Sequence, residues 1–215
     1  MSLLLCYITD RSQFAGDSAQ QEARLLEKIT ECAATGVDYI QLREKDLSGR
    51  DLERLAERAL NAFPGGAKTG LLINSRVDVA LACVARGVHL PSHDISVRDA
   101  RAVFRRAGVA PPIISVSCHT TEEVAQAEAD GADFVVLGPV FEKAGQPGSE
   151  GLQLLSSACH IKPASGAPVR VLALGGVTLE NAESCIRAGA RGIAAIRLFQ
   201  QNNAFDMVEK LRAIP

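Results

Sequence analysis

The chain has 215 residues, a net charge of −2 at pH 7 and 47% hydrophobic residues. This length is near the lower limit for one α/β barrel, so we expect residues 1–215 to form a single domain. The nearly balanced charge provides no basic excess for nucleic acid or an anionic membrane, and we expect neither as a partner.

The apolar amino terminus, residues 3–8, is interpreted as a first β-strand. It lacks a positively charged start and reaches Asp10 and Arg11 too early for a secretion signal or a membrane span. The six cysteines are scattered without a C-x-x-C pair. We therefore expect reduced, buried thiols and a cytoplasmic protein. Cys118 follows a predicted strand beside a histidine, so a reactive thiol there is kept as an alternative.

Short apolar or β-branched runs alternate with helical patterns along the chain. Eight strands are predicted at residues 3–9, 39–42, 71–74, 88–90, 113–117, 134–137, 169–174 and 193–196. Amphipathic helices are predicted between them, for example at 19–35, 51–60 and 121–130. Strict alternation predicts parallel strands with right-handed crossovers.

A weak internal repeat supports a closed sheet. A glycine follows a helix and leads into a strand at Gly36, Gly87, Gly131 and Gly189. We expect each to adopt the left-handed conformation that ends a helix. The copies recur at every second strand, which favours a (β/α)8 TIM barrel. An open doubly wound sheet is the alternative, but no G-x-G-x-x-G follows the first strand to favour it.

The segment 41–46, with the sequence QLREKD, is the most charged of the predicted strand ends. The carboxyl ends of barrel strands form one ring that holds the active site. Two cations and two acids there indicate a pocket for a small, highly charged substrate. The alternative is a solvated turn before the helix at 51–60.

The other predicted strand ends are also mostly polar or glycine. They contribute Thr9 and Asp10; Gln41, Arg43 and Lys45; Asn74, Ser75 and Arg76; His89 and Asp94; Ser117 and His119; Gly138 and Pro139; Gly175 and Gly176; and Ile196 and Arg197. A shared polar pocket explains this pattern better than solvation of the strand ends alone.

Gly175 and Gly176 follow the predicted seventh strand and precede a helix that starts near Thr178, while the eighth strand ends at Ile196 and Arg197. Bare backbone N–H groups and a helix amino end at this position hold phosphate in barrels. We therefore predict a phosphate site here. The alternative is that the glycines only form a tight turn.

His119 is the candidate catalytic base. It follows the predicted fifth strand, and a histidine with an unperturbed pKa of about 6.5 can accept and return a proton at neutral pH. The alternative is an ordinary loop histidine. His89 and His93 flank the end of the fourth strand, and His160 is predicted on a helix surface. No H-x-x-H or H-E-x-x-H spacing predicts a zinc site.

Taken together, these motifs resemble the family that contains the thiamine phosphate synthases and the TenI-type thiazole tautomerases. The matching segments are residues 7–10, 40–46, 72–76, 78–81, 87–90, 115–119, 131–134, 138–141 and 173–177. The resemblance implies a (β/α)8 barrel of thiamine biosynthesis that binds a thiazole phosphate at the ring. It implies His119 as the catalytic group. The substrate or phosphate ligands would be Gln41, Arg43, Lys45, Asn74, Ser117, Gly138, Gly175, Gly176, Ile196 and Arg197.

The chain departs from the synthase pattern at two places. The resemblance implies that a synthase holds Mg²⁺ with an Asn-Asp pair after the third strand and an acid after the fourth. Here the pair is Asn74 and Ser75, so one carboxylate is missing, although Asp94 remains as a metal ligand for a synthase. Synthases also carry a T-x-T-K segment, and the matching residues 143–146 lack both hydroxyls and the final lysine.

We therefore expect a thiazole tautomerase without a cofactor, which moves a proton on a carboxylated thiazole phosphate to give the aromatic isomer. Residues 90–92 and 150–151 also resemble the tautomerase branch. Gln41, Arg43 and Lys45 instead resemble the pyrimidine-diphosphate set of the synthases, so a Mg²⁺-dependent synthase is the alternative. A non-catalytic regulator that binds thiamine intermediates is the second alternative.

The sequence leaves several points open. Arg197 is unusual, since a small residue is typical there in both branches, and it either strengthens the phosphate clamp or obstructs the pocket. A homo-oligomer is kept as an alternative to a monomer, and so is the presence of a separate synthase in the same cell.

Overall fold

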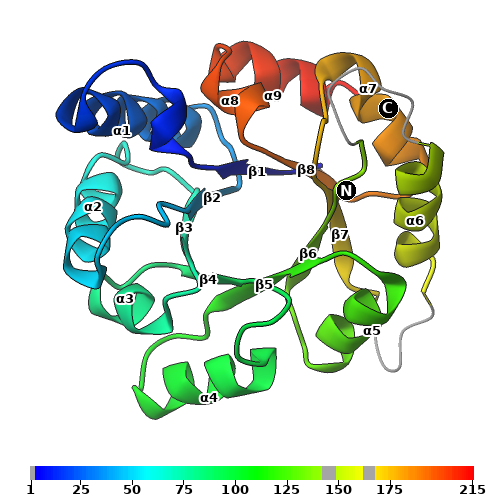
Figure 1. Cartoon of the computed structure of the whole chain (residues 1–215), viewed down its shortest axis with the longest axis horizontal. Helices are drawn as coiled ribbons and strands as arrows, with labels where there is room; N and C mark the ends of the chain where they lie inside the picture. The colour runs from blue at the N-terminus through cyan, green and yellow to red at the C-terminus, as the bar shows by residue number, and fades with distance from the viewer. Residues whose placement is uncertain (1–2, 142–148, 162–167) are drawn as a thin grey trace.

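The computed structural model describes residues 3–141, 149–161 and 168–215. Its eight parallel strands close a barrel in chain order, from β1 to β8 and back to β1. Figure 1 shows the helices arranged around the outside of this barrel. The predicted (β/α)8 barrel is confirmed, and the open sheet is excluded because β1 pairs with β8.

All predicted strands are present, each within one residue of its predicted ends. They are β1 (Leu4–Ile8), β2 (Tyr39–Leu42), β3 (Gly70–Asn74), β4 (Gly87–Leu90), β5 (Ile113–Cys118), β6 (Phe134–Leu137), β7 (Arg170–Ala173) and β8 (Gly192–Ala195). The helices are η1 (Arg11–Gln13), α1 (Ser18–Ala34), α2 (Gly49–Asn61), α3 (Val77–Ala82), α4 (Val97–Arg106), α5 (Thr121–Ala129), α6 (Ser149–Cys159), α7 (Leu179–Arg187), α8 (Arg197–Gln200) and α9 (Ala204–Arg212). Within the described ranges, no helix has the length and apolar character needed to cross a bilayer.

Alternate residues of each strand point into the barrel, as the pleat requires. The inward-facing apolar residues form a cluster of their own, which contains Cys6, Ile8, Leu72, Phe134, Val136, Leu172 and Ala194. The ring of Phe134 stacks on Tyr39 with 5.0 Å between the ring centroids. A separate, larger cluster lies between the strands and the helices. The barrel is therefore a packed core rather than a channel.

One copy of the predicted glycine repeat was wrongly interpreted. Gly36, Gly131 and Gly189 have the expected positive φ angles, but after α3 the left-handed residue is Val84, with φ 53°. Gly87 is the first residue of β4, and a Cβ atom there would lie 1.8 Å from the carbonyl oxygen of Ile113. Gly87 therefore permits the close pairing of β4 with β5 instead of ending a helix.

A buried ion pair connects the ends of β1 and β2. The Arg11 guanidinium donates to Glu44 Oε2 at 3.0 Å, and both side chains are buried. Glu44 also accepts from the Thr9 hydroxyl at 2.6 Å and from the Arg11 backbone N–H at 3.1 Å. Asp46, which is largely exposed, accepts two further bonds from the same guanidinium. These bonds compensate the cost of burying the two charges.

We expect Glu44→Ala to lower the free energy of unfolding by about 3–5 kcal/mol, because it leaves the Arg11 cation buried without its partner. Asp46→Ala is the matched control, since that side chain is 71% exposed and its loss should cost about 1 kcal/mol or less. Urea denaturation of both variants measures the difference. An equal loss of unfolding free energy in the two variants would show that the buried contact contributes no more than the exposed one.

Candidate active site

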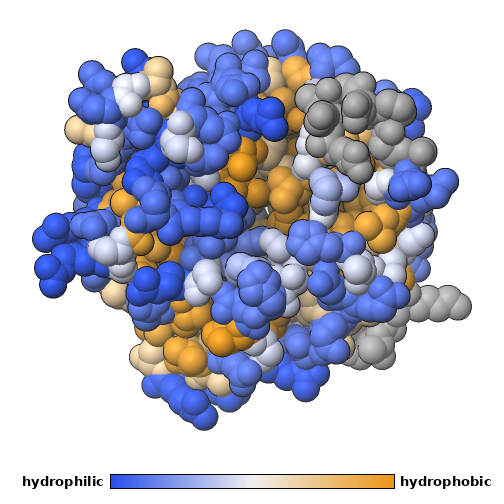
Figure 2. All heavy atoms as spheres, viewed as in Figure 1, coloured by the Kyte–Doolittle hydropathy of each residue, from blue (hydrophilic) through white to orange (hydrophobic). Residues whose placement is uncertain are grey.

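Predicted site residues from neighbouring strands meet at the carboxyl ends of β2 to β5. Gln41 Nε2 donates to Asn74 Oδ1 at 2.8 Å, and the ring of His89 lies 2.7 Å from the Ser117 hydroxyl. Gln41 Oε1 is buried and has no hydrogen-bond partner among the described residues. Since buried polar atoms are normally paired, this oxygen is available to a donor on a ligand. Figure 2 shows the face seen down the barrel, where apolar side chains are visible near the centre and hydrophilic side chains lie to the left of them and below.

The acids and the cations of segment 41–46 have different roles. Glu44 and Asp46 bind Arg11, so they belong to the fold rather than to a substrate site. The Arg43 backbone is held by a hydrogen bond from its N–H to the Thr9 hydroxyl, at 2.9 Å. Neither Arg43 nor Lys45 has a carboxylate within ion-pair distance in the part of the chain that the structure describes. These two cations therefore remain available to an anionic group.

His119 is oriented by two neighbouring elements. Its ring Nδ1 lies 2.6 Å from the carbonyl oxygen of Gly138, just after β6, and its backbone N–H donates to the Glu123 side chain on α5. A carbonyl oxygen only accepts, so Nδ1 carries the proton and Nε2 has the lone pair in the neutral ring. Nε2 has no partner among the described residues, which leaves it available as a base.

Cys118 is unsuited to the reactive role that the sequence left as an alternative. The side chain is fully buried, and burial, followed by the negative charge of Glu123, raises the pKa of its thiol to about 12. Such a thiol is protonated at neutral pH and is a poor nucleophile. All six cysteines are free, and five of them are buried, in agreement with the predicted reduced thiols.

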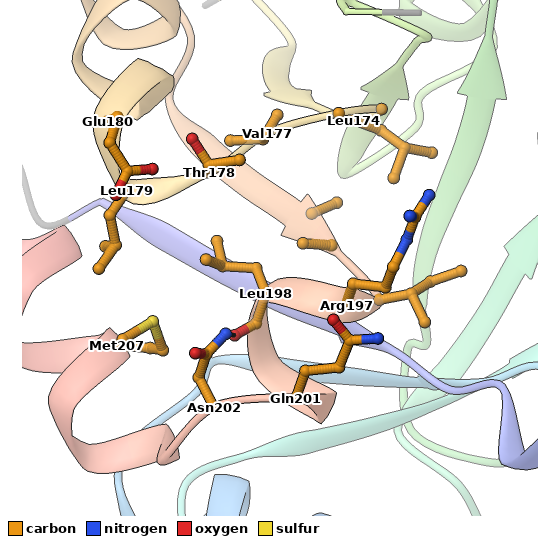
Figure 3. A pocket seen from close by; sticks show the side chains of 15 residues that line it. Leu174, Val177, Thr178, Leu179, Glu180, Arg197, Leu198, Gln201, Asn202 and Met207 are labelled. Carbon is orange, nitrogen blue, oxygen red and sulfur yellow. Dashed lines mark hydrogen bonds between the residues drawn. The ribbon is translucent and has the colours of Figure 1, made fainter. Parts of the chain in front are cut away.

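The four residues of the predicted phosphate site line one cavity of about 370 Å³ between the ends of β7 and β8. Figure 3 shows this cavity with the labelled side chains around it. Asn181 on α7 accepts from the Thr178 N–H at 2.8 Å and donates to the Gly176 carbonyl at 3.0 Å. This pair of bonds holds the turn that contains Gly175 and Gly176.

The turn leaves backbone donors exposed to the cavity. In the described part of the chain, the N–H groups of Gly175, Gly176 and Val177 have no hydrogen-bond acceptor. They stand at the amino end of α7, whose dipole favours an anion. An anion in this cavity would satisfy these donors, so the geometry agrees with a phosphate site.

Both glycines of the turn are also required by packing. Their φ angles are 96° and 61°, and a Cβ atom on Gly176 would lie 2.7 Å from the Phe141 side chain. A Cβ atom on Gly175 would meet Pro139 at the same distance. The tight-turn and anion-site interpretations of this pair are thus compatible.

Arg197 borders the cavity without filling it. Figure 3 shows its side chain extending from the start of α8 toward Leu174, whereas Glu180 lies on the opposite side. These two are the charged residues among those that line the cavity. Because the cavity keeps its volume with Arg197 in place, this residue does not obstruct the pocket in this conformation.

Ser75 occupies the place of the carboxylate that the family pattern uses for Mg²⁺. It has a left-handed backbone, with φ 64°, and its hydroxyl donates to Asp94 Oδ2. The other carboxylate oxygen of Asp94 accepts from the Ile95 N–H at 2.8 Å. The described residues contain no group of three acidic, histidine or cysteine side chains that could hold a metal ion. Since Mg²⁺ prefers several oxygen ligands with carboxylates foremost, these residues do not fit such a site.

The remaining comparisons between sequence and structure concern segment 143–146, Arg11 and His89. Residues 143–146, compared above with the T-x-T-K segment, lie outside the described residues. Sequence reasoning missed Arg11, whose partners are far away along the chain. His89 lies near the end of β4, where the sequence placed it, and the structure shows in addition that its side chain is buried, with 3% exposure. The alternation of β4 indicates the inward position, because His89 pairs with the inward-facing Asn74 and Ser115.

Comparisons with known proteins agree with this arrangement. The family described as thiamine monophosphate synthase matches residues 5–199. The thiamine-phosphate synthase of Chlorobium luteolum is 36% identical over 195 residues, which cover 91% of this chain and 84% of that protein. The thiamine-phosphate synthase of Syntrophomonas wolfei is 34% identical over 215 residues, covering 98% and 95%.

A solved structure, the thiamine phosphate pyrophosphorylase from Pyrococcus furiosus, superposes with a TM-score of 0.77 at 28% identity. The superposition covers 99% of this chain and 95% of the Pyrococcus furiosus chain. The fold, the polar ring of strand ends and these similarities lead to one conclusion. The chain belongs to the thiamine monophosphate synthase family and is an enzyme of thiamine biosynthesis.

Proposed function

We propose that this enzyme acts on a carboxylated thiazole phosphate as a metal-independent tautomerase. The observation that carries the proposal is the unpaired Nε2 of His119, oriented by Gly138 on the same barrel face as an anion cavity. Ser75 supports it, because its hydroxyl takes up an Asp94 oxygen that a metal ion would need. Proton transfer within one substrate requires a base and a phosphate clamp, and needs no metal.

The proposed reaction moves one proton from one atom of the carboxylated thiazole phosphate to another, which gives the aromatic isomer. The N–H groups of residues 175–177, together with Arg197, bind the phosphate and fix the ring over the barrel mouth. His119 Nε2 accepts a proton from one atom of the substrate and returns it to another atom of the same molecule, so substrate and product have the same composition. While His119 carries both protons, its Nδ1–H remains bonded to the Gly138 carbonyl, which stabilises the imidazolium.

A thiamine phosphate synthase is the second candidate function. The names of the relatives favour it over the tautomerase. The free cations Arg43 and Lys45 also favour it, because they suit a diphosphate better than a lone carboxylate. In that reaction the enzyme would join hydroxymethylpyrimidine diphosphate to thiazole phosphate. The poor fit of Ser75 and Asp94 to Mg²⁺ argues against it.

We expect His119→Asn to lower turnover of carboxythiazole phosphate by about 10²–10⁴-fold, because asparagine keeps a polar side chain but has no titratable nitrogen. Binding of thiazole phosphate, measured by calorimetry, should be retained. Steady-state turnover of the purified variant tests this.

His160→Asn is the matched control for this experiment. His160 is exposed and its Nδ1 also lies close to a backbone carbonyl, 2.7 Å from that of Ser156, but it is remote from the barrel mouth. Its replacement should leave turnover unchanged. Should His119→Asn retain turnover within a few-fold of the wild type, His119 is not the base.

We expect turnover of carboxythiazole phosphate to persist at the wild-type rate after the metal is removed with a chelator. The physical reason is the missing second carboxylate at Ser75. The same preparation is assayed for thiamine phosphate formation with and without Mg²⁺. Loss of all activity on chelation, or rapid Mg²⁺-dependent thiamine phosphate formation, establishes the synthase instead.

A pair of variants provides the metal control. Ser75→Asp supplies a second carboxylate facing Asp94, whereas Ser75→Asn supplies an amide of similar size. Both residue types tolerate the left-handed backbone of this position. Calorimetric titration with Mg²⁺ should show binding only for the aspartate variant.

A further inference from the structure

A buried histidine bridges two serines inside the barrel, and the mechanism above makes no use of it. His89 on β4 lies with Nδ1 2.8 Å from the Ser115 hydroxyl and Nε2 2.7 Å from the Ser117 hydroxyl. His89 is 3% exposed and Ser115 is fully buried, while Ser117 is only partly buried. The three side chains therefore form a row that runs from the packed interior to the barrel mouth.

The His89–serine row contains one proton more than its two hydrogen bonds use, and burial determines which atom carries this unused proton. A neutral imidazole carries one N–H, and each hydroxyl carries one O–H, so three protons serve two hydrogen bonds. If Nδ1 were protonated, it would donate to Ser115, and the Ser115 proton would have no acceptor, since no other partner of that hydroxyl exists among the described residues. An unpaired donor in the interior is unfavourable.

The opposite tautomer satisfies every buried atom of the row. Ser115 then donates to Nδ1, and Nε2–H donates to Ser117. The Ser117 hydroxyl accepts this bond, and its own proton is free to point into the barrel mouth. The buried Ser115 hydroxyl thereby determines the direction of both hydrogen bonds.

The charge state of His89 supports a single ring proton. Burial, followed by the positive charge of Arg43, lowers the pKa of His89 to about 3. The imidazole is therefore neutral throughout the neutral pH range. The row cannot reverse by binding a second proton under those conditions.

We propose that His89 is a positioning residue that holds Ser117 as a hydrogen-bond donor to a lone-pair acceptor of the substrate ring. Ser117 lies in the last part of β5 and His119 is the first residue after this strand, so both stand at its carboxyl end. When His119 removes a ring proton, electron density increases on the ring, and a fixed hydroxyl donor stabilises it. This step rests on the proposed function, since it assigns Ser117 to the same ring on which His119 acts.

The tautomer of His89 is measured directly in the wild-type protein. Labelling the histidines with ¹⁵N lets NMR distinguish protonated from unprotonated ring nitrogens, and His89→Gln identifies the His89 signals. We expect a proton on Nε2, none on Nδ1, and no titration between about pH 5 and 9. His119 should show the opposite tautomer in its neutral form, with the proton on Nδ1. A proton on Nδ1 of His89, or a charged His89 ring, overturns the proposal.

A double-mutant cycle tests whether His89 acts through Ser117. Ser117→Ala should lower kcat for carboxythiazole phosphate by about tenfold, the weight of one neutral hydrogen bond. His89→Leu should lower kcat similarly when Ser117 is present and should have no further effect on Ser117→Ala. His89→Gln, whose amide both donates and accepts, should recover part of the loss. Thermal melting confirms that each variant is folded.

Additive losses in this cycle would show that His89 has only a packing role, and the proposal would be wrong. The two experiments separate the inference from the proposed function. If the wild type does not turn over carboxythiazole phosphate, the tautomerase assignment fails, and the NMR experiment still decides whether His89 directs the Ser117 proton.

Discussion

Closure of the parallel sheet is the constraint on which the rest of this molecule depends. Once β1 pairs with β8, every strand must direct alternate residues inward and present its carboxyl end to the same ring. The interior is filled by apolar side chains such as Phe134 and Leu172, and becomes polar toward the ring, at Gln41, His89 and Ser117. The chemistry of the site thus begins inside the barrel, where side chains have little freedom to move.

Some charged side chains around the barrel mouth pair with each other, and others have no partner. Arg11 neutralises the acids of segment 41–46, and Arg43 and Lys45 remain as unpaired cations within the described residues. At the ends of β7 and β8, Arg197 and residues with unpaired backbone donors line the cavity described above. A substrate with negative charge at two ends suits this distribution. A single phosphate group would contact only one of these two groups of donors.

Two features near the barrel mouth favour different ones of the two proposed functions. The cations Arg43 and Lys45 are compatible with a diphosphate, whereas the Ser75 hydroxyl occupies one carboxylate oxygen of Asp94. Ser75 has a left-handed backbone, with φ 64°, in the turn after β3.

The sequence by itself determined the strand order, the closed barrel and the positions of His119 and the glycine pair, because these depend on local periodicity and on the residue types at the end of each strand. It did not reveal that Glu44 bonds Arg11, 33 residues away, or that His89 bridges two serines of another strand. It also misplaced the left-handed residue after α3, at Val84 rather than Gly87. These features depend on the register between strands and on the direction of each side chain. Both are set only when the sheet closes and buried polar atoms must find partners.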